Sequence, residues 1–252
     1  MNGNSVIQGL WIGDRLSTME RLSIASFLAN GHAFHLYAYG DVENVPEGAI
    51  MCSAEAIVPH SRVFRYQENG SYAGFSNLFR YKLLLDKGGW WTDMDTICLQ
   101  PLDFPDDYVF SSEMLRGSEV IDAAVIKAPA GSPLAEFAFD ISNSKDPAKV
   151  KWGETGPRLL QQAVERFQLQ AHVQRASAFC PIDWPDWEWV LDPEREIAFG
   201  PETFAVHLWN EVWRRNGRDK DAGYPPGCLF ERLKSRYFGS NSGEYRSNSA
   251  AL

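Results

Sequence analysis

The chain has few cysteines, and their number and spacing do not fit a zinc-binding protein or a small protein held together by disulfides. Four cysteines are scattered over 252 residues, with no CxxC pair and no other spacing typical of a zinc site. Isolated cysteines in a chain of this length are typical of reduced structural thiols. We therefore expect a cytoplasmic protein without a disulfide framework.

Positive charge is also scarce. The chain carries 24 Lys and Arg against 33 Asp and Glu, a formal net charge of −9 at pH 7. This balance does not fit a protein that binds nucleic acid through a broad basic surface. Anionic ligands would have to be bound locally, by a metal ion or by a few arginines.

Long apolar runs are missing as well. No stretch approaches the ~18 apolar residues needed to span a membrane, and residues 1–8 lack the basic and apolar parts of a signal peptide. We expect no transmembrane segment, which leaves only a peripheral role at a membrane open.

The first 40 residues predict a β-α-β unit. Residues 5–12 are expected to form a strand, followed by a helix with Ser17 at its N-cap and Glu20 at the capping-box position. Residues 33–39 form the expected second strand. This order favours a parallel sheet of nucleotide-binding topology, but no GxGxxG or GxxxxGK[ST] motif is present.

The remaining pattern predicts one α/β domain over residues 1–238 and a flexible tail over residues 239–252. Further strands are expected over 96–99, 108–112, 120–127 and 204–209, with a short strand and a helical turn over 49–58. Helices are expected over 74–87, 132–142, 157–167 and from residue 226 to 237. The proline-rich residues 176–194 are expected to be irregular.

Two carboxylates follow the helix over residues 74–87. Gly88 and Gly89 end this helix, and Asp93 and Asp95 are expected in a turn that leads directly into the next strand. In extended chain, residues two apart face the same way, about 6.6 Å from each other. Such a pair suits Mg²⁺ or Mn²⁺, and the cation would neutralise a bound diphosphate.

The spacing alone is weak support for a metal site, because the chain contains a second Asp-x-Asp. Asp219 and Asp221 flank Lys220 in a polar stretch rich in arginine. We expect this second pair to lie in a solvated loop without a metal. Only the surrounding sequence distinguishes the first pair from the second.

Residues 80–95, together with Ser76 and Asn77, resemble the DXD-containing sugar-binding region of the α-1,4-galactosyltransferase and α-1,6-mannosyltransferase group. The resemblance is more distant to the clostridial toxin glucosyltransferases. It implies a GT-A fold, in which one α/β domain has a mostly parallel central sheet flanked by helices. It also implies a UDP- or GDP-linked sugar donor, Mn²⁺ or Mg²⁺, and hexose transfer with retention to an acceptor hydroxyl. The acceptor would be a glycan, a glycolipid or a polysaccharide precursor.

The resemblance also implies roles for individual residues. The expected donor-binding residues are Trp11, Ser76, Asn77, Arg80, Gly89 and Asp93. Trp11 would contact the nucleotide base and Arg80 the diphosphate. Asn77 departs from the aspartate that is commoner in the group, which leaves the donor sugar open.

Three further residues complete the expected site. His207 would join Asp93 and Asp95 as a metal ligand, although a single histidine in a strand is often structural. Asp122 would lie near the donor sugar, and Glu154 would face the acceptor or simply favour a helix start. The expected catalytic set is Asp93, Asp95, Asp122 and Glu154. Trp184, Trp187 and Trp189 would either stack on an acceptor sugar or anchor the proline-rich segment.

Two other functions fit part of this pattern. A nucleotidyltransferase would also use paired acids and a metal, but residues 13–16 are a poor version of its glycine-rich phosphate loop. A non-catalytic carbohydrate-binding module would use the many aromatic residues, which make up 13% of the chain, without a nucleotide.

Overall fold

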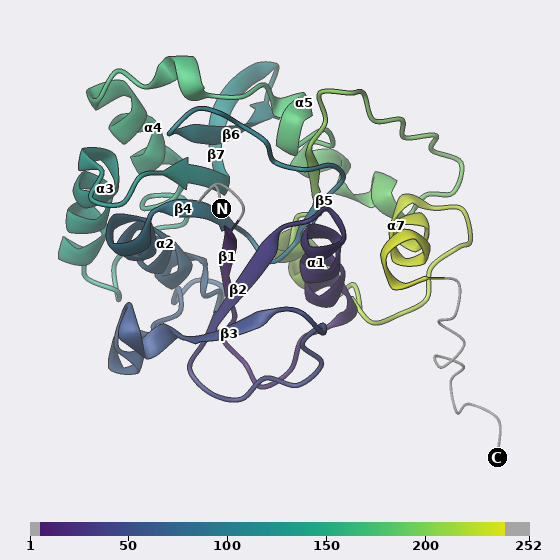
Figure 1. Cartoon of the computed structure of the whole chain (residues 1–252), viewed down its shortest axis with the longest axis horizontal. Helices are drawn as coiled ribbons and strands as arrows, with labels where there is room; N and C mark the ends of the chain where they lie inside the picture. The colour runs from purple at the N-terminus through teal and green to yellow at the C-terminus, as the bar shows by residue number, and fades with distance from the viewer. Residues whose placement is uncertain (1–5, 240–252) are drawn as a thin grey trace.

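The computed structural model describes residues 6–239, which form a single α/β unit around a six-stranded sheet (Figure 1). The strand order is β3-β2-β1-β4-β7-β6, in which the first four strands run parallel and β7 pairs antiparallel with β4 on one side and β6 on the other. The strands are β1 (Val6–Leu10), β2 (Ala33–Ala38), β3 (Ile50–Ser53), β4 (Gly89–Thr92), β6 (Val109–Leu115) and β7 (Ser118–Ala128). The expected α/β class with a mostly parallel sheet is confirmed.

Helices cover both faces of this sheet (Figure 1). They are α1 (Thr18–Ala29), α2 (Ala73–Lys87), α3 (Pro133–Ser144), α4 (Pro157–Arg166), α5 (Ala176–Phe179), α6 (Asn210–Arg215) and α7 (Leu229–Phe238). One core lies between the sheet and α2, α3 and α4, and the other includes α1 and α7. Two short strands, β5 (Thr96–Cys98) and β8 (Ala205–His207), form a separate antiparallel pair.

Local signals account for several of these elements. Ser17 and Glu20 form the expected capping box of α1, with the Ser17 backbone N–H donating to Glu20 Oε2 at 2.9 Å. Pro157 stands in the first turn of α4, as expected. Both helices therefore begin where the sequence predicts.

The stretch over residues 88–95 departs from the expectation. It is not a simple turn between a helix and a strand, because residues 89–92 form β4 in the middle of the sheet. Trp90 and Trp91 are fully buried and point into the two different cores, as consecutive strand residues must. Gly88 has φ +63°, and a Cβ there would lie 2.4 Å from the backbone nitrogen of Ala130. The glycine is required for the chain to enter β4.

Other differences are smaller. Residues 176–194, expected to be irregular, contain the short helix α5 and a 3-10 helix over Trp184–Leu191. Gly239 ends α7, and the rest of the expected tail, residues 240–252, lies outside the described residues.

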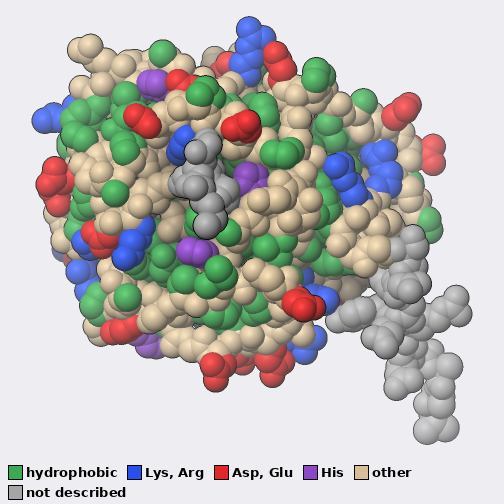
Figure 2. Space-filling view, viewed as in Figure 1, with side chains coloured by type: hydrophobic (Ala, Val, Ile, Leu, Met, Phe, Trp, Pro, Cys, Tyr) green, Lys and Arg blue, Asp and Glu red, His purple; other side chains and the backbone are tan. Residues whose placement is uncertain are grey.

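The described surface agrees with the low content of basic residues. On the face in Figure 2, Lys and Arg side chains are scattered among Asp and Glu rather than gathered in one patch. Among the described helices, none is long and apolar enough to cross a membrane.

Candidate functional site

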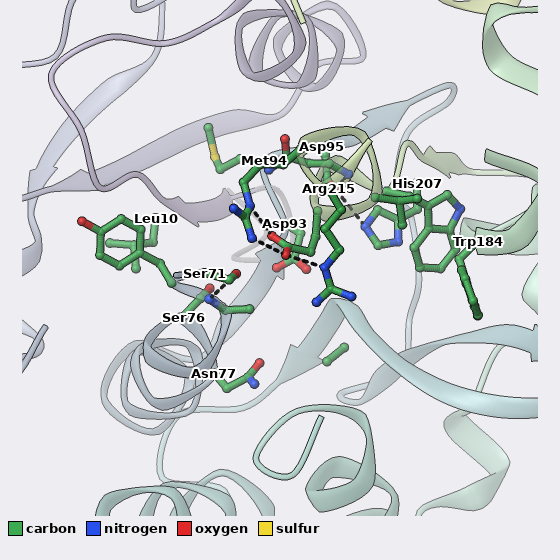
Figure 3. Close-up of a pocket in the computed structure, with 18 of the residues that line it drawn as sticks. Leu10, Ser71, Ser76, Asn77, Asp93, Met94, Asp95, Trp184, His207 and Arg215 are labelled. Carbon is green, nitrogen blue, oxygen red and sulfur yellow. Dashed lines mark hydrogen bonds and ion pairs between the residues drawn. The ribbon is translucent and has the colours of Figure 1, made fainter. Parts of the chain in front are cut away.

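A cavity of about 1010 Å³ opens where β1 and β4 end. Its walls come from segments that are far apart in the sequence (Figure 3). They are residues 10–12 at the end of β1, one side of α2, the turn after β4, part of β7 and the chain from His207 onward. Ligands of open α/β sheets bind at such carboxyl ends of strands. The cavity therefore lies where the fold itself favours a ligand.

Asp93, Asp95 and His207 meet in this cavity (Figure 3). Asp93 and Asp95 lie in a tight turn between β4 and β5, closed by a 3.2 Å hydrogen bond from Thr96 N–H to the Asp93 carbonyl. The two acids thus lie in a turn, as expected, and not in the extended chain whose spacing suggested that they converge. The pairing of Thr96 with His207 between β5 and β8 places the imidazole beside Asp95, with His207 Nε2 at 3.2 Å from Asp95 Oδ2.

Backbone geometry holds this group of residues in place. Trp209 has φ +59°, a left-handed conformation that is costly for a bulky residue. The following residue, Asn210, donates its backbone N–H to Asp95 Oδ2 at 2.7 Å. The Trp209 ring lies 4.0 Å from the His207 ring, and its Nε1 donates to the Ile182 carbonyl at 2.8 Å. The segment after β8 thus orients both Asp95 and His207.

The ligand atoms of Asp93, Asp95 and His207 all lie within 4.8 Å of one another. Two carboxylates and one imidazole are a donor set suited to a divalent cation such as Mn²⁺. The residues present therefore fit a bound metal ion.

The charged side chains in this group shift one another's pKa values. Burial raises the pKa of Asp93 to about 6, although the Arg80 guanidinium opposes this shift. Burial would also raise the pKa of Asp95, but the charge and hydrogen bond of His207 outweigh it and lower that pKa. For His207, burial would lower the pKa, but the negative charge of Asp95 raises it to about 9. Without a metal, the imidazolium of His207 is thus the cation that Asp95 binds.

Arg80 is the second cation at the site. It is 4% exposed, and its Nη2 lies 2.9 Å from Asp93 Oδ1. Nη1 donates to the Ala123 carbonyl, Nη2 also donates to Ser76 Oγ at 3.3 Å, and the guanidinium lies 4.9 Å from the Trp91 ring centre. Arg80 therefore holds Asp93 in position as well as facing the cavity.

Asn77 lies one residue after Ser76 and lines the same cavity. It is buried, and its Nδ2 donates to Thr155 Oγ1 at 3.4 Å. A Cβ on Gly156 would lie 2.9 Å from that amide nitrogen. The loop before α4 thus packs tightly against Asn77.

Trp11 lines the cavity just after the end of β1 and is partly buried. Its Nε1 donates to the Arg15 carbonyl at 3.1 Å, and Lys220 Nζ lies 5.4 Å from its ring centre.

The second Asp-x-Asp, formed by Asp219 and Asp221, is more than a solvated loop. Asp221 accepts hydrogen bonds from Thr18 N–H at 2.7 Å and Thr18 Oγ1 at 2.8 Å, so it binds the first turn of α1, and it lines the cavity too.

Asp122 and Glu113 face the cavity from the antiparallel strands β7 and β6. Asp122 Oδ2 accepts hydrogen bonds from Ala124 N–H at 2.9 Å and Ser111 Oγ at 3.3 Å. Glu113 has a buried Oε2 without a hydrogen-bond partner, and burial followed by the charge of Asp122 raises its pKa to about 7. No signal in the sequence identified Glu113, because this residue lies one position beyond the strand expected over 108–112 and follows two polar residues, both serine.

Two expected site residues are not brought to the cavity. Glu154 does not line it and forms an ion pair with Lys145 at 2.7 Å. Gly89 begins β4 and lies next to the Gln8 side chain, also away from the cavity wall.

The three tryptophans of residues 184–189 separate into different environments. Trp184 is 42% exposed and lines the cavity. Trp187 is buried against Trp213, with ring centres 5.9 Å apart, and Trp189 packs against the core from its edge. Only Trp184 is free to contact an acceptor.

Two family models match the chain in separate segments. The model described as "Glycosyltransferase sugar-binding region containing DXD motif" matches residues 49–115, which include Asp93 and Asp95. The model described as "Alpha 1,4-glycosyltransferase conserved region" matches residues 148–237, which include His207. No curated protein matches the chain.

Solved structures resemble the chain in fold. One titled "PaToxG Glycosyltransferase" has a TM-score of 0.50 and 18% identity, over 65% of this chain and 69% of that one. Another, titled "Structure of Transferase", has a TM-score of 0.43 and 12% identity, over 73% of this chain and 91% of that one. The first likeness shows a shared fold, whereas the second is too weak to support a conclusion.

Proposed function

We propose that this chain, as a glycosyltransferase of the DXD-containing, α-1,4-glycosyltransferase-like type, is metal-dependent and transfers its sugar with retention of the anomeric configuration. It would transfer a hexose from a nucleotide-diphosphate sugar to an acceptor hydroxyl. The observation that carries the proposal is the meeting of Asp93, Asp95 and His207 in one cavity, from segments that match the two family models.

Asp93, Asp95 and His207 would hold Mn²⁺ or Mg²⁺. The metal would supply positive charge to the leaving diphosphate. Arg80 would supply a second positive charge from the same wall, because its guanidinium lies 2.9 Å from Asp93 and lines the cavity.

The donor would lie between the two walls of the cavity. Trp11 would contact the base, since it is partly buried and lines the wall at the end of β1. Ser76 and Asn77 would contact the sugar from α2. Because an amide carries no charge, Asn77 favours hydrogen bonds with neutral sugar hydroxyls.

Retention is proposed to occur by front-side transfer, in which the departing diphosphate takes the acceptor proton. A double displacement would need a carboxylate free to attack the anomeric carbon. Asp122 Oδ2 already accepts hydrogen bonds from Ala124 N–H and Ser111 Oγ. Asp122 is therefore proposed to stabilise positive charge on the sugar rather than to attack it, and Glu154, paired with Lys145, has no part. An inverted product from a single-anomer donor, detected by NMR, would contradict this mechanism.

Trp184 is the proposed contact of the acceptor, which would be a glycan, a lipid-linked glycan or a polysaccharide precursor. Its ring is 42% exposed at the cavity, where a sugar ring can stack on it. All four cysteines are free, which supports a reducing compartment, so the cytoplasm is the proposed location.

Calorimetry tests the central part of the proposal. UDP and GDP would be titrated with and without Mn²⁺ into the wild type, Asp95→Asn and Asp221→Asn. Metal-dependent binding should be lost in Asp95→Asn and kept in Asp221→Asn, whose side chain contacts Thr18 instead of the metal group.

Other results would favour the alternatives. Binding of sugars without nucleotide or metal would favour a carbohydrate-binding module. Release of pyrophosphate from a nucleoside triphosphate and a sugar phosphate would favour a nucleotidyltransferase.

A further inference from the structure

His207 has a second set of neighbours on the side away from Asp95. Its Nδ1 lies 4.0 Å from Cys180 Sγ and 3.9 Å from Asp122 Oδ2, and these sulfur and oxygen atoms lie 3.7 Å apart. Cys180 is 1% exposed, and Asp122 and His207 are each 6% exposed. One sulfur, one nitrogen and one oxygen thus form a nearly equilateral triangle in the protein interior.

This triangle has the dimensions of three ligands on a tetrahedral metal ion. With Zn–S near 2.3 Å and Zn–N or Zn–O near 2.0 Å, ligand atoms lie roughly 3.3 to 3.6 Å apart. The three distances here are about 0.2 to 0.6 Å longer than those separations. Thiolate and imidazole together select borderline-soft ions such as Zn²⁺ over Mg²⁺ or Mn²⁺. We infer that Asp122, Cys180 and His207 form a second metal site, specific for Zn²⁺ and similar thiophilic divalent ions.

The surrounding groups support a bound cation at this position. Asp95 accepts the Nε2 hydrogen of His207 at 3.2 Å, the carboxylate–histidine–metal arrangement that directs the other nitrogen toward a metal. Asp122 is itself held by Ala124 N–H and Ser111 Oγ. Glu113 adds a buried Oε2 that has no hydrogen-bond partner among the described residues. Because Asp122, Glu113 and His207 line the cavity, an ion reaches the site through it.

Binding at this second site changes the role of His207. A metal on Nδ1 displaces the thiol proton of Cys180 and one proton of the imidazolium, and both protons pass to solvent. The neutral imidazole then keeps its single proton on Nε2, where it donates to Asp95. Nε2 is no longer available as a ligand for the ion at Asp93 and Asp95. Zn²⁺ therefore weakens Mn²⁺ binding, and this consequence rests on the proposed function.

A Co²⁺ titration tests the site itself and needs neither nucleotide nor transferase activity. Metal-free wild type should gain a near-ultraviolet thiolate-to-Co²⁺ absorption band. Cys180→Ser should lack the band and bind Zn²⁺ more weakly by on the order of 100-fold or more, since loss of an outer partner alone costs 10- to 100-fold. Cys98→Ser is the matched control, because Cys98 is equally buried and its Sγ donates to the Gln100 carbonyl at 3.1 Å, away from the group of Asp122, Cys180 and His207. A band that persists in Cys180→Ser, or is absent from the wild type, overturns the site.

Donor hydrolysis tests the consequence. At fixed Mn²⁺, Zn²⁺ should inhibit the wild type, and added Mn²⁺ should relieve the inhibition. Cys180→Ser should keep its Mn²⁺-dependent rate but resist Zn²⁺, and Cys180→Ala serves in its place if the serine variant unfolds. Equal inhibition of wild type and variant refutes the competition for His207. A failure of the proposed function alone would leave the Co²⁺ band intact but show no hydrolysis.

Discussion

Replacing His207 with glutamine should change how the stability of the metal-free protein depends on pH. Burial and the charge of Asp95 act on His207 in opposite directions, and the charge prevails to raise its pKa to about 9 from the ordinary value of 6.5. A histidine whose folded pKa is raised stabilises the fold fully below the unfolded pKa. That contribution is lost as pH rises through the folded pKa. The window for this effect is therefore pH 6.5 to about 9.

The size of the effect follows from the shift. A shift of 2.5 pKa units, at 1.36 kcal/mol per unit, corresponds to about 3 kcal/mol. His207 is 6% exposed, so solvent screening reduces this value little. The free energy of unfolding of the wild type should fall by this amount between pH 6 and pH 10, relative to His207→Gln.

Urea unfolding in the presence of a chelator measures the effect. Wild type and His207→Gln would be unfolded at intervals of half a pH unit, and the difference in free energy would be plotted against pH. Titrations of groups that do not interact with His207 cancel in this difference. A difference that stays constant from pH 6 to pH 10 would show that the pKa of His207 is not raised in the metal-free fold.

Mn²⁺ affinity should depend on pH in the opposite direction, rising where the stability of the metal-free protein falls. A metal binds the neutral imidazole, so Mn²⁺ affinity should rise with pH up to about 9 in the wild type. His207→Gln should lack the rise above about pH 7, where Asp93, with a pKa of about 6, is already ionised. An unchanged rise in the variant would exclude His207 as a metal ligand.

Four further substitutions test the site and the fold. Arg80→Ala leaves Asp93 without its ion-pair partner and should lower the free energy of unfolding, measured by chemical denaturation, by about 3 kcal/mol. This value is at the lower end of the range for a buried ion pair, because Asp93 faces the cavity. Gly88→Ala should cost about 3 kcal/mol, since its φ of +63° and a contact of 2.4 Å both oppose a Cβ. Gly31→Ala, with positive φ but open space, should cost only about 1 kcal/mol, and equal losses would contradict the steric argument. Trp184→Ala should leave stability within about 0.5 kcal/mol and raise the acceptor KM roughly tenfold in a transfer assay, and an unchanged KM would remove Trp184 from the acceptor site.

The sequence by itself determined the elements that depend on neighbouring residues. The capping box of Ser17 and Glu20 begins α1, and Pro157 begins α4, because both signals act on backbone groups within one helical turn. The parallel β-α-β opening follows from the same local patterns. The glycosyltransferase motif around Asp93 and Asp95 is contiguous, so it too could be recognised without the fold.

The tertiary structure decided which strand is central. Trp90 and Trp91 are buried on opposite faces of the sheet, so β4 has no alternation of apolar and polar residues that would identify it as a strand. Its pairing with β1 on one side and β7 on the other supplies the missing information.

Long-range contacts also decided the composition of the site. His207 reaches Asp95 through the register of β5 with β8, and Glu154 is kept away by Lys145. Glu113 joins the cavity only because β6 pairs with β7. A side chain's type is readable from the chain, but its partner depends on strand register and packing between distant segments. Those are set by the whole core rather than by any local pattern.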